Sequence, residues 1–373
     1  MRLKMRCKDL TPFMVMDIVR DASKYEDAIH FEIGQPDLPP SPKVLKTLEK
    51  NLNKAAYTQS KGLEELRGKI AKHYEKEYGV SVDTSQIFLT PGTSGAFIMA
   101  YALTLSSGDI LGLSDPSYPC YKNVARVLDI EPLFLPISKE SSYELRKEDI
   151  KGKNIKAIQI SSPANPTGNI YGKNGLKELI KGCKEEGISF ISDELYHGLT
   201  YEKRAHSALE FDDELYVING FSKYFCMPGF RLGWIIVPKQ KLKEAEILAQ
   251  NLFICPPTLS QYAALEAFDE EYLSFVRDTF RKRRDYLFEA LSEFFTIDAK
   301  PEGAFYLWAD ISKYSNDSAL FAKELLEKIH VAATPGVDFG IKDGKKYMRF
   351  AYTKEISHMR EGVDRLRQYL SLK

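Results

Sequence analysis

Short apolar runs alternate with longer amphipathic stretches through the middle of this sequence. Each run is bounded by turn residues and is followed by a segment whose apolar positions recur with helical spacing. Several runs are apolar at every position, which is typical of central strands covered by helices on both faces. The alternation predicts an α/β fold with a mainly parallel, seven-stranded sheet between helices. The predicted strands are residues 86–90, 110–114, 131–136, 157–161, 189–192, 215–219 and 233–237.

The pattern changes after Pro256 and Pro257. Long, charged amphipathic helices are predicted over residues 259–268 and 272–295, and the apolar segment 303–309 follows them. This texture predicts a second, smaller α+β domain. We therefore divide the chain into an N-terminal segment that packs on the small domain, a large domain that begins near a predicted helix, and a small C-terminal domain, at residues 1–40, 41–255 and 256–373.

The composition is that of an ordinary globular protein. The chain has 373 residues, of which 44% are hydrophobic, and its 52 Lys and Arg balance its 52 Asp and Glu. A net charge of zero provides no overall field to attract nucleic acid or an anionic membrane, so a bound anion needs a local site. The basic N-terminus, residues 1–9, is followed by no continuous apolar stretch, and no window approaches the roughly 20 apolar residues that span a bilayer. We expect a cytoplasmic protein without a membrane segment.

The cysteines are far apart in the sequence and form no C-x-x-C pair, and the histidines show no metal-ligand spacing such as H-E-x-x-H. These spacings predict free thiols in a reducing cytoplasm and no metal site. The cysteines are Cys7, Cys120, Cys183, Cys226 and Cys255.

One segment joins a lysine and an arginine at the end of a predicted strand. Ser222 and Lys223 follow the strand at 215–219, and Arg231 comes eight residues after Lys223, beside a glycine and the next strand. An amine nucleophile and an anion-binding guanidinium are able to converge at such a turn. The full string, S-K-x-F-x-M-P-G-x-R-x-G, resembles the cofactor-lysine motif of class I/II aminotransferases, which share the fold type I architecture of aspartate aminotransferase. The resemblance implies that Lys223 holds pyridoxal 5'-phosphate (PLP) as a Schiff base and that Ser222 and Arg231 bind its phosphate.

Further segments match the same family, in the same order, from about residue 31 to residue 352. The first is a glycine-rich turn between a predicted strand and an apolar helix, Thr90-Pro91-Gly92-Thr93-Ser94-Gly95-Ala96. Its free backbone N–H groups and the positive end of the helix dipole suit a phosphate, although a tight connection with ordinary helix caps has the same pattern. The resemblance assigns Gly92, Thr93 and Ser94 to the cofactor phosphate.

Polar residues at three other strand ends match positions that surround the cofactor ring. The resemblance implies that Tyr118 stacks on the pyridine ring and that Asp193 pairs with its protonated nitrogen. It also implies that Asn165, in an N-P-x-G turn, and Tyr196 hydrogen-bond the phenolic oxygen. On local grounds a core tyrosine, a structural Asn-Pro turn and a helix N-cap at Asp193 remain open.

Three residues concern the substrate and a second subunit. Arg349 lies in the strand-like run 347–351, where the family keeps the arginine that grips the substrate α-carboxylate. Gly34 matches an N-terminal glycine whose backbone approaches the same group. Tyr57 resembles the residue that reaches the partner's phosphate, which implies a homodimer with shared active sites, whereas a loop tyrosine beside the following helix is the local alternative.

The implied reaction is transamination between an amino acid and a 2-oxo acid. Lys223 would move the substrate α-proton as general base and acid, and ping-pong kinetics follow. A carbon-sulfur β-lyase, or another fold type I PLP enzyme, remains the alternative, because the cofactor supplies the same chemistry in each. A non-enzymatic PLP-fold regulator is a weaker alternative, because such proteins usually carry a DNA-binding domain, the predicted α/β region begins too early to leave space for one, and the net charge is zero. A nicotinamide dehydrogenase would need G-x-G-x-x-G after the first strand, and the turn at residues 91–96 does not supply it.

Other candidate residues carry no predicted chemistry. His197 follows Tyr196 but matches no catalytic position, and we interpret it as structural. The basic run from Arg281 to Arg284 lies in an amphipathic helix with acidic neighbours, which favours a solvated helix face. Lys61, in the loop beside Tyr57, could meet a second substrate carboxylate, which would favour aspartate or glutamate, but a loop lysine faces solvent by default.

Overall fold

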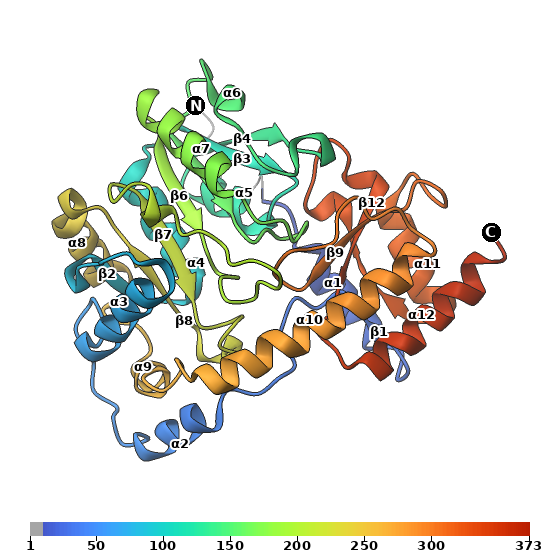
Figure 1. Cartoon of the computed structure of the whole chain (residues 1–373), viewed down its shortest axis with the longest axis horizontal. Helices are drawn as coiled ribbons and strands as arrows, with labels where there is room; N and C mark the ends of the chain where they lie inside the picture. Colours follow the sequence, from blue (N-terminus) through green and yellow to red (C-terminus); the bar gives the residue numbers. More distant parts are fainter. Residues whose placement is uncertain (1–9) are drawn as a thin grey trace, which may run out of the picture.

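The computed structural model describes residues 10–373, so the basic N-terminus and Cys7 lie outside the described residues. A seven-stranded sheet forms the centre of the larger part, in the order β2-β8-β7-β6-β5-β3-β4 (Figure 1). Each strand begins and ends within one residue of its predicted position, because short apolar runs between turn residues mark buried strands clearly. The strands are β2 (Ile87–Pro91), β3 (Ile110–Asp115), β4 (Glu131–Pro136), β5 (Ala157–Ser161), β6 (Ser189–Asp193), β7 (Tyr216–Gly220) and β8 (Leu232–Ile236).

β8 runs antiparallel to both β2 and β7, while the other neighbouring strands of this sheet pair in parallel. The predicted mainly parallel sheet is therefore confirmed. The register of β2 with β8 pairs Pro91 with Leu232. The turn that follows β2 consequently lies beside the turn that precedes β8, which brings Gly92 close to Arg231.

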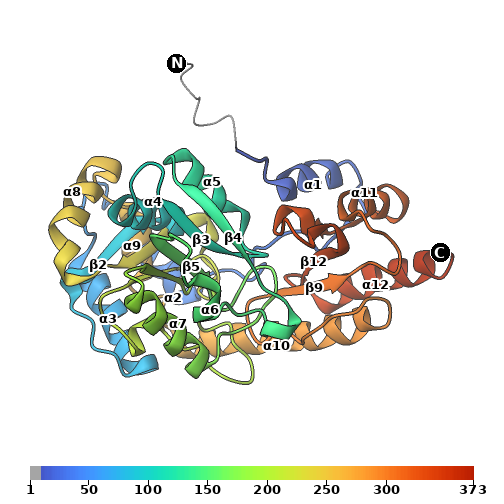
Figure 2. The ribbon, with the colours of Figure 1, turned by 90° about the horizontal axis from the view of Figure 1, so that it is seen from above.

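Two layers of helices cover the large sheet, one on each of its faces (Figure 2). In β2, Ile87 and Leu89 pack in the core cluster that contains α3 and α7, whereas Phe88 packs in the cluster that contains α4, α5 and α8. This alternation buries both faces of the sheet. The helices are α3 (Glu64–Tyr78), α4 (Gly92–Thr104), α5 (Pro119–Val127), α6 (Lys147–Ile150), α7 (Lys173–Glu185) and α8 (Leu242–Phe253).

The smaller part contains an antiparallel sheet in the order β11-β12-β9, packed with long helices. Strand β1 pairs in parallel with β10, so the N-terminal segment joins the C-terminal part of the chain, and α1 lies beside α11 (Figure 2). The elements are α1 (Met14–Ala22), β1 (Ile29–His30), β9 (Tyr306–Asp310), α11 (Ser318–Ile329), β10 (Val331–Ala332), β11 (Thr334–Pro335), β12 (Tyr347–Ala351) and α12 (Ile356–Leu370).

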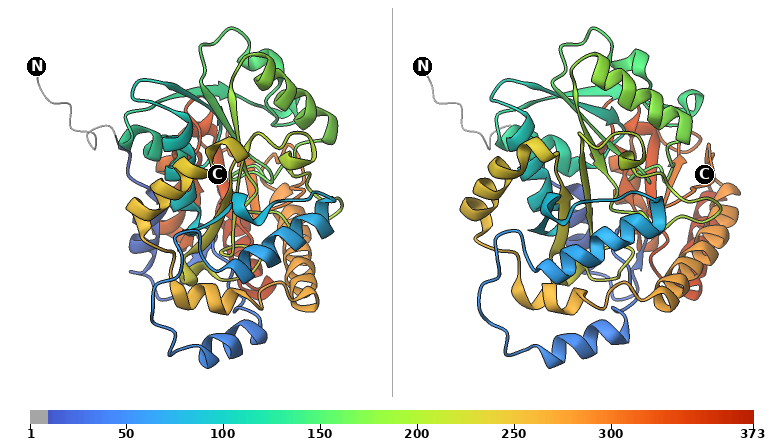
Figure 3. Two further views of the ribbon diagram at one scale, coloured as in Figure 1. Left: turned by 90° about the vertical axis from the view of Figure 1, so that its left-hand side faces the viewer. Right: turned by 60° about the vertical axis from the view of Figure 1, so that its left-hand side comes forward.

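Helix α10 (Glu270–Ser292) connects the larger part to the smaller one, and two shorter helices pack together near its beginning. Helices α2 (Pro42–Lys50) and α9 (Thr258–Ala264) lie side by side at the bottom of both views in Figure 3, and α10 runs from α9 toward the smaller sheet (Figure 1). We propose that the boundaries between the N-terminal segment, the large domain and the small C-terminal domain lie near residues 40 and 255. No helix within residues 10–373 has the length and apolar character needed to cross a lipid bilayer.

The prediction that residues 281–284 form a solvated helix face is wrong for two of the four. Arg283 is buried and donates to both carboxylate oxygens of Asp37, at 2.7 and 3.1 Å. Arg284 is also buried, and donates to Glu202 and to the carbonyl oxygen of Pro301. Sequence periodicity did not reveal this because the partners lie on segments far from α10 in the sequence, and planar guanidinium groups tolerate burial when they are paired.

We expect Arg283→Ala to lower the free energy of unfolding by about 2 kcal/mol, because the change leaves Asp37 without its cation. The expected cost is lower than that for a fully buried pair because the Asp37 side chain is 22% exposed. Arg281→Ala is the matched control, since its pair with Asp278 is exposed at both ends, and should cost less than about 0.5 kcal/mol. Urea unfolding of the two variants measures the difference; equal costs would contradict the assignment.

Candidate active site

A cavity of about 250 Å³ lies where the carboxyl ends of the large sheet's parallel strands meet the smaller part. Open α/β sheets bind ligands at this edge. Nearly all of the predicted site residues line it, although they come from segments spread over more than 300 positions of the chain. They are Gly34, Thr93, Ser94, Tyr118, Asn165, Asp193, Tyr196, Ser222, Lys223, Arg231 and Arg349.

Helix α4 begins at the edge of this cavity without a side-chain cap. Its first residue, Gly92, has a φ of +68°, and a Cβ there would lie 2.6 Å from Nη2 of Arg231. Glycine is therefore required both for the backbone conformation and for the close approach of the guanidinium. Arg231 itself has a φ of +48°, which is uncommon for a residue with a side chain. Uncapped N–H groups, a helix dipole and a guanidinium together form an anion site.

Lys223 follows β7 and projects into the cavity. Its Nζ donates to the carbonyl oxygen of Gly34 at 2.7 Å and lies 5.8 Å from the ring centre of Phe305. Burial, followed by the charges of Arg349 and Arg231, lowers the pKa of this amine to about 8, while Asp193 opposes the shift. The amine is thus able to lose and regain a proton near neutral pH.

Asp193 ends β6 and is held by two hydrogen bonds. The hydroxyl of Tyr121 donates to Oδ2 at 2.5 Å, and the backbone N–H of Leu195 donates to Oδ1 at 3.0 Å. Burial raises the pKa of the carboxyl to about 6, although both hydrogen bonds and Lys223 favour the ionised form. Sequence reasoning missed Tyr121. Its position, one helical turn after Tyr118 at the start of α5, is the signal that could have found it.

Arg349 is buried in β12 and is oriented by several acceptors. Nη1 donates to Oδ1 of Asn165 at 3.0 Å, and Nη2 donates to the carbonyl oxygen of Glu32 at 2.7 Å and to Thr334 at 3.2 Å. The guanidinium carbon lies 4.3 Å from the ring centre of Tyr306. Its buried Nε–H has no hydrogen-bond partner among residues 10–373. A carboxylate ligand would satisfy this donor, which is costly to leave unpaired.

Tyr306 connects several of the predicted residues but was itself not predicted. Its hydroxyl lies 2.7 Å from the hydroxyl of Tyr196, and a Cβ at Gly34 would collide with it, so glycine is needed there. Tyr118 packs edge-on against Tyr121, with ring centres 5.4 Å apart. The sequence indicated only an apolar segment around Tyr306, and nothing in that pattern distinguishes a site tyrosine from a core tyrosine.

Four candidates from the sequence are not among the residues that line this cavity. Gly92 lies at its edge, where it contacts Arg231, and the other three lie elsewhere. Tyr57 is 78% exposed, in the loop between α2 and α3. Lys61 pairs with Glu246 at 3.2 Å, which leaves it no role in its own chain's cavity. His197 is buried, and its Nδ1 lies 2.8 Å from the hydroxyl of Tyr78, as suits a structural residue.

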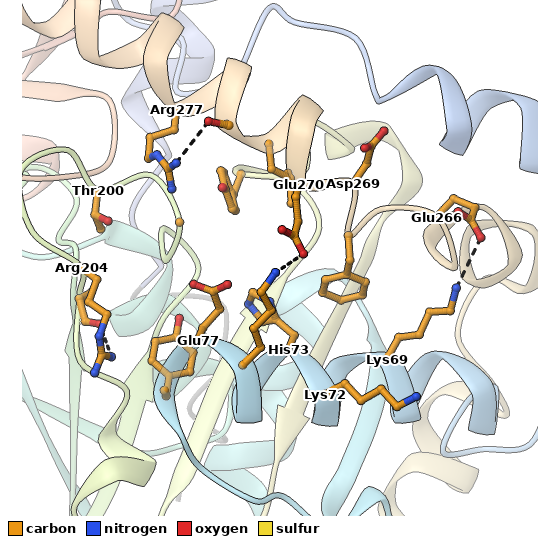
Figure 4. Close-up of a pocket in the computed structure, with 18 of the residues that line it drawn as sticks. Lys69, Lys72, His73, Glu77, Thr200, Arg204, Glu266, Asp269, Glu270 and Arg277 are labelled. Carbon is orange, nitrogen blue, oxygen red and sulfur yellow. Dashed lines mark hydrogen bonds and ion pairs between the residues drawn. The ribbon is translucent and has the colours of Figure 1, made fainter.

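A larger cavity, of about 670 Å³, lies between α3 and the start of α10 (Figure 4). His73 lines it, and burial lowers the pKa of this histidine to about 4, so its ring is neutral at pH 7. None of the predicted site residues lies there. Lysines on its rim pair with nearby carboxylates, as Lys43 with Asp269, Lys69 with Glu266 and Lys76 with Glu270. The smaller cavity therefore has the chemistry of an active site, and the larger one is a groove between packed helices.

Glu194, directly after Asp193, is fully buried behind the site. Its Oε1 accepts from the backbone N–H of Ala208 and from the hydroxyls of Ser207 and Ser192, at 2.9 to 3.1 Å. Burial nevertheless raises the pKa of this carboxyl to about 8. The folded protein therefore holds a proton that the unfolded chain releases above the ordinary glutamate pKa.

This proton predicts a pH dependence of stability. The stabilisation is fully present below about pH 4.5 and is lost as the pH rises toward 8, because only the folded state keeps Glu194 protonated in that window. Glu194→Gln keeps a neutral side chain and should lose less stability than the native protein between pH 5 and pH 8. Even half of this shift corresponds to about 2 kcal/mol. Urea unfolding of both proteins at the two pH values tests this; parallel pH profiles would contradict it.

Comparison with known proteins gives the family. The profile of the family described as Aminotransferase class I and II matches residues 26–366. The (5-formylfuran-3-yl)methyl phosphate transaminase of Methanocaldococcus jannaschii is 37% identical, with 99% of this chain and all of the relative covered. The valine–pyruvate aminotransferase of Mycobacterium tuberculosis is 31% identical over 96% of each chain.

Solved structures agree with this grouping. A putative aminotransferase from Silicibacter pomeroyi superposes with a TM-score of 0.93 at 39% identity, and both chains are fully covered. The similarity thus spans both sheets and the cavity between the two parts. The chain belongs to the class I and II aminotransferase family, which uses PLP, and is an aminotransferase with the aspartate aminotransferase-like fold.

Proposed function

We propose that this aminotransferase exchanges an amino group between an amino acid and a 2-oxo acid by a ping-pong mechanism, with PLP bound in the cavity at the start of α4. The observation that carries the proposal is the Lys223 amine, which lines the cavity and donates to the carbonyl oxygen of Gly34 at 2.7 Å. Burial lowers its pKa to about 8, so the amine is able to release and take up a proton near neutral pH. The fit of the cofactor rests on the uncapped start of α4, where Gly92 leaves room for the Arg231 guanidinium.

The residues around the cavity divide into three groups in this proposal. The phosphate would be held by Gly92, Thr93 and Ser94 together with Ser222 and Arg231. The ring would lie against Tyr118, with Asp193 at its nitrogen and with Asn165 and Tyr196 at its phenolic oxygen. Because Oδ1 of Asn165 accepts from Arg349, its amide N–H₂ remains available to donate.

When bound, PLP supplies an electron sink for the negative charge that develops at the substrate α-carbon. Arg349 holds the substrate α-carboxylate through its unpaired Nε–H, and Gly34 forms the adjacent wall. Lys223 would serve as the general base and acid that moves the proton at the substrate α-carbon. Asp193, whose ionised form is favoured by the hydrogen bonds from Tyr121 and from the backbone N–H of Leu195, would pair with the cofactor's ring nitrogen and stabilise its cationic form.

The proposal includes a homodimer in which Tyr57 reaches the partner's phosphate site. Its support is that Tyr57 is exposed and does not line the cavity of its own chain. Mixing Lys223→Ala with Tyr57→Ala subunits should restore part of the activity that each variant lacks, because a hybrid dimer contains one site with both residues intact. Sedimentation at equilibrium gives the oligomeric state, and a monomer would contradict this part of the proposal.

A half-reaction screen tests the whole proposal. Amino acids are added singly to the holoenzyme, and the cofactor absorbance is followed without a 2-oxo acid. Amino transfer predicts a stoichiometric spectral change, one equivalent of 2-oxo acid and a return of the spectrum when a 2-oxo acid is added. Continuous release of ammonia and pyruvate from a cysteine-like substrate would instead indicate β-elimination.

A further inference from the structure

Helix α1 supplies an apolar wall to the active-site cavity. Phe13, Val15, Met16 and Val19 line it, from the residue before the helix through its second turn, and Ile33 continues the wall. The polar residues of the helix, such as Asp17 and Arg20, pair with each other on its exposed side. The wall therefore presents hydrocarbon surface where the side chain of a bound substrate would extend beyond the reacting carbon.

In the proposed function, each positively charged side chain that the described part of the chain contributes to the cavity already has a role, and none is left to bind a carboxylate on the substrate side chain. Among residues 10–373, the positively charged side chains that line it are Lys223, Arg231 and Arg349. Arg231 faces the start of α4, Lys223 is the reacting amine, and Arg349 takes the α-carboxylate. Lys61, the one further lysine considered from the sequence, is paired with Glu246 outside the cavity. A second substrate carboxylate would lose its hydration without gaining a cation of this chain, which is unfavourable.

The wall is held in place by contacts from both parts of the molecule. The start of α1 has no side-chain cap of its own. The Asp338 carboxyl lies close to it: burial raises the pKa of this carboxyl, and the nearby backbone N–H groups of Met14 and Val15 oppose the rise. Ahead of the helix, the side-chain amide of Asn123 in α5 both donates to and accepts from the backbone of Thr11, at 3.2 Å each. These bonds place α1 across the gap between the two parts.

The wall also touches the residue proposed to stack on the cofactor. The Phe13 ring packs edge-on against Tyr118, with ring centres 5.9 Å apart and an angle of 82° between the rings. The apolar surface is thus continuous from α1 to the cofactor position. A hydrocarbon side chain that follows this surface would remove additional apolar area from water, which stabilises its complex.

We infer that the amino acid substrate carries an uncharged, apolar side chain, which the α1 wall recognises, and that dicarboxylic amino acids are poor substrates. The inference rests on the proposed function, because it assigns Arg231 and Arg349 to the cofactor phosphate and the α-carboxylate. The residues that set specificity are Val15, Met16, Val19 and Ile33. They are contributed by the N-terminal segment, which contains none of the residues proposed to hold the cofactor.

The test compares leucine with aspartate, whose side chains have nearly the same shape but differ in charge. The efficiency of each half-reaction is its rate constant divided by the amino acid concentration at half-saturation. This efficiency should be about 100-fold or more higher for leucine than for aspartate, because the aspartate side-chain carboxylate must lose its hydration. The unreactive analogues 4-methylpentanoate and butanedioate, titrated into the holoenzyme by calorimetry, should show the same order of affinity. Comparable or better values for aspartate and butanedioate would overturn the inference.

A substitution in the wall tests the same idea from the protein side. Met16 is 62% exposed at the cavity mouth, so Met16→Arg should fold and should shift the leucine-to-aspartate ratio toward aspartate by about tenfold or more. Leu320→Arg is the matched control, because Leu320 is an exposed apolar residue of α11 that does not line the cavity, and it should leave the ratio unchanged. A ratio that does not move in Met16→Arg counts against the α1 wall as the recognising surface.

The experiments distinguish a failure of the proposed function from a failure of the inferred substrate class. If no amino acid of either class changes the cofactor spectrum, the proposed function is wrong. If amino acids react but the dicarboxylic ones react best, the proposed function stands and the inference about the substrate class is wrong.

Discussion

Lys223→Ala is expected to lower kcat by about 10⁴-fold, the upper end of what general acid–base catalysis contributes. The substitution removes both the covalent attachment point of the cofactor and the group proposed to move the substrate proton. Among residues 10–373, the other cationic side chains that line the cavity are those of Arg231 and Arg349, which are guanidinium groups and not amines. Single-turnover absorbance measurements with a large excess of amino acid give the rate directly.

The covalent part of this expectation has its own measurement. Borohydride reduction followed by peptide mass analysis should place the cofactor on Lys223 in the native protein and on no lysine in Lys223→Ala. Lys61→Ala is the matched control, because Lys61 belongs to a loop near the large sheet but pairs with Glu246 outside the cavity. Reducible cofactor retained by Lys223→Ala, at native stoichiometry, would refute the assignment.

Asp193→Asn is expected to lower kcat by about 10³-fold while the fold is kept. An amide has nearly the shape of the carboxylate but no charge, so a protonated ring nitrogen would lose its counterion. The effect should appear in kcat more than in KM, because the ion pair matters most when negative charge develops at the substrate α-carbon. Stopped-flow half-reactions and a urea unfolding curve separate the chemical effect from any loss of stability.

Tyr121→Phe provides a graded comparison for the same carboxylate. It removes the donor to Oδ2 of Asp193 but leaves the charge, so a decrease of about tenfold is expected, the value of one hydrogen bond to a charged group. Without this hydrogen bond the pKa of Asp193 should also rise, since Tyr121 favours the ionised form. As the pH is lowered, Tyr121→Phe should therefore lose its activity at a higher pH than the native protein does.

The sequence predicts the large sheet well and the smaller part only in outline. Each central strand was visible as a short apolar run, because burial on both faces leaves little choice of residue. Strands β1, β10 and β11 have two residues each and no pattern of their own, so they form only because the tertiary structure supplies their partners. The burial of Arg283 and Arg284 could not be predicted for the same reason, since Asp37 and Glu202 are far away in the sequence.

The site residues divide in the same way. Gly92, Asn165, Asp193 and Lys223 stand at strand ends inside recognisable motifs, and their convergence follows from the parallel sheet. Tyr121 and Tyr306 have ordinary apolar surroundings in the sequence, and only the coordinates reveal what their hydroxyl groups contact. The α1 wall was not anticipated either, because a nine-residue amphipathic helix has the same pattern whether it faces a core or a substrate.

The pairing of β1 with β10 sets an order of events during synthesis of the chain. Ile29 leaves the ribosome early, but its strand partner, Val331, follows about 300 residues later, a delay of roughly 15–60 s at about 5–20 residues per second. During that interval the N-terminal segment has no sheet to join, and the apolar residues of α1 remain in water. The large sheet, whose strands are all made before residue 237, is free to form first. Translation must therefore nearly finish before the α1 wall joins the cavity. A nascent chain that stalls before β10 would already contain the residues proposed to bind the cofactor, but the apolar residues of α1 would stay exposed and prone to aggregation.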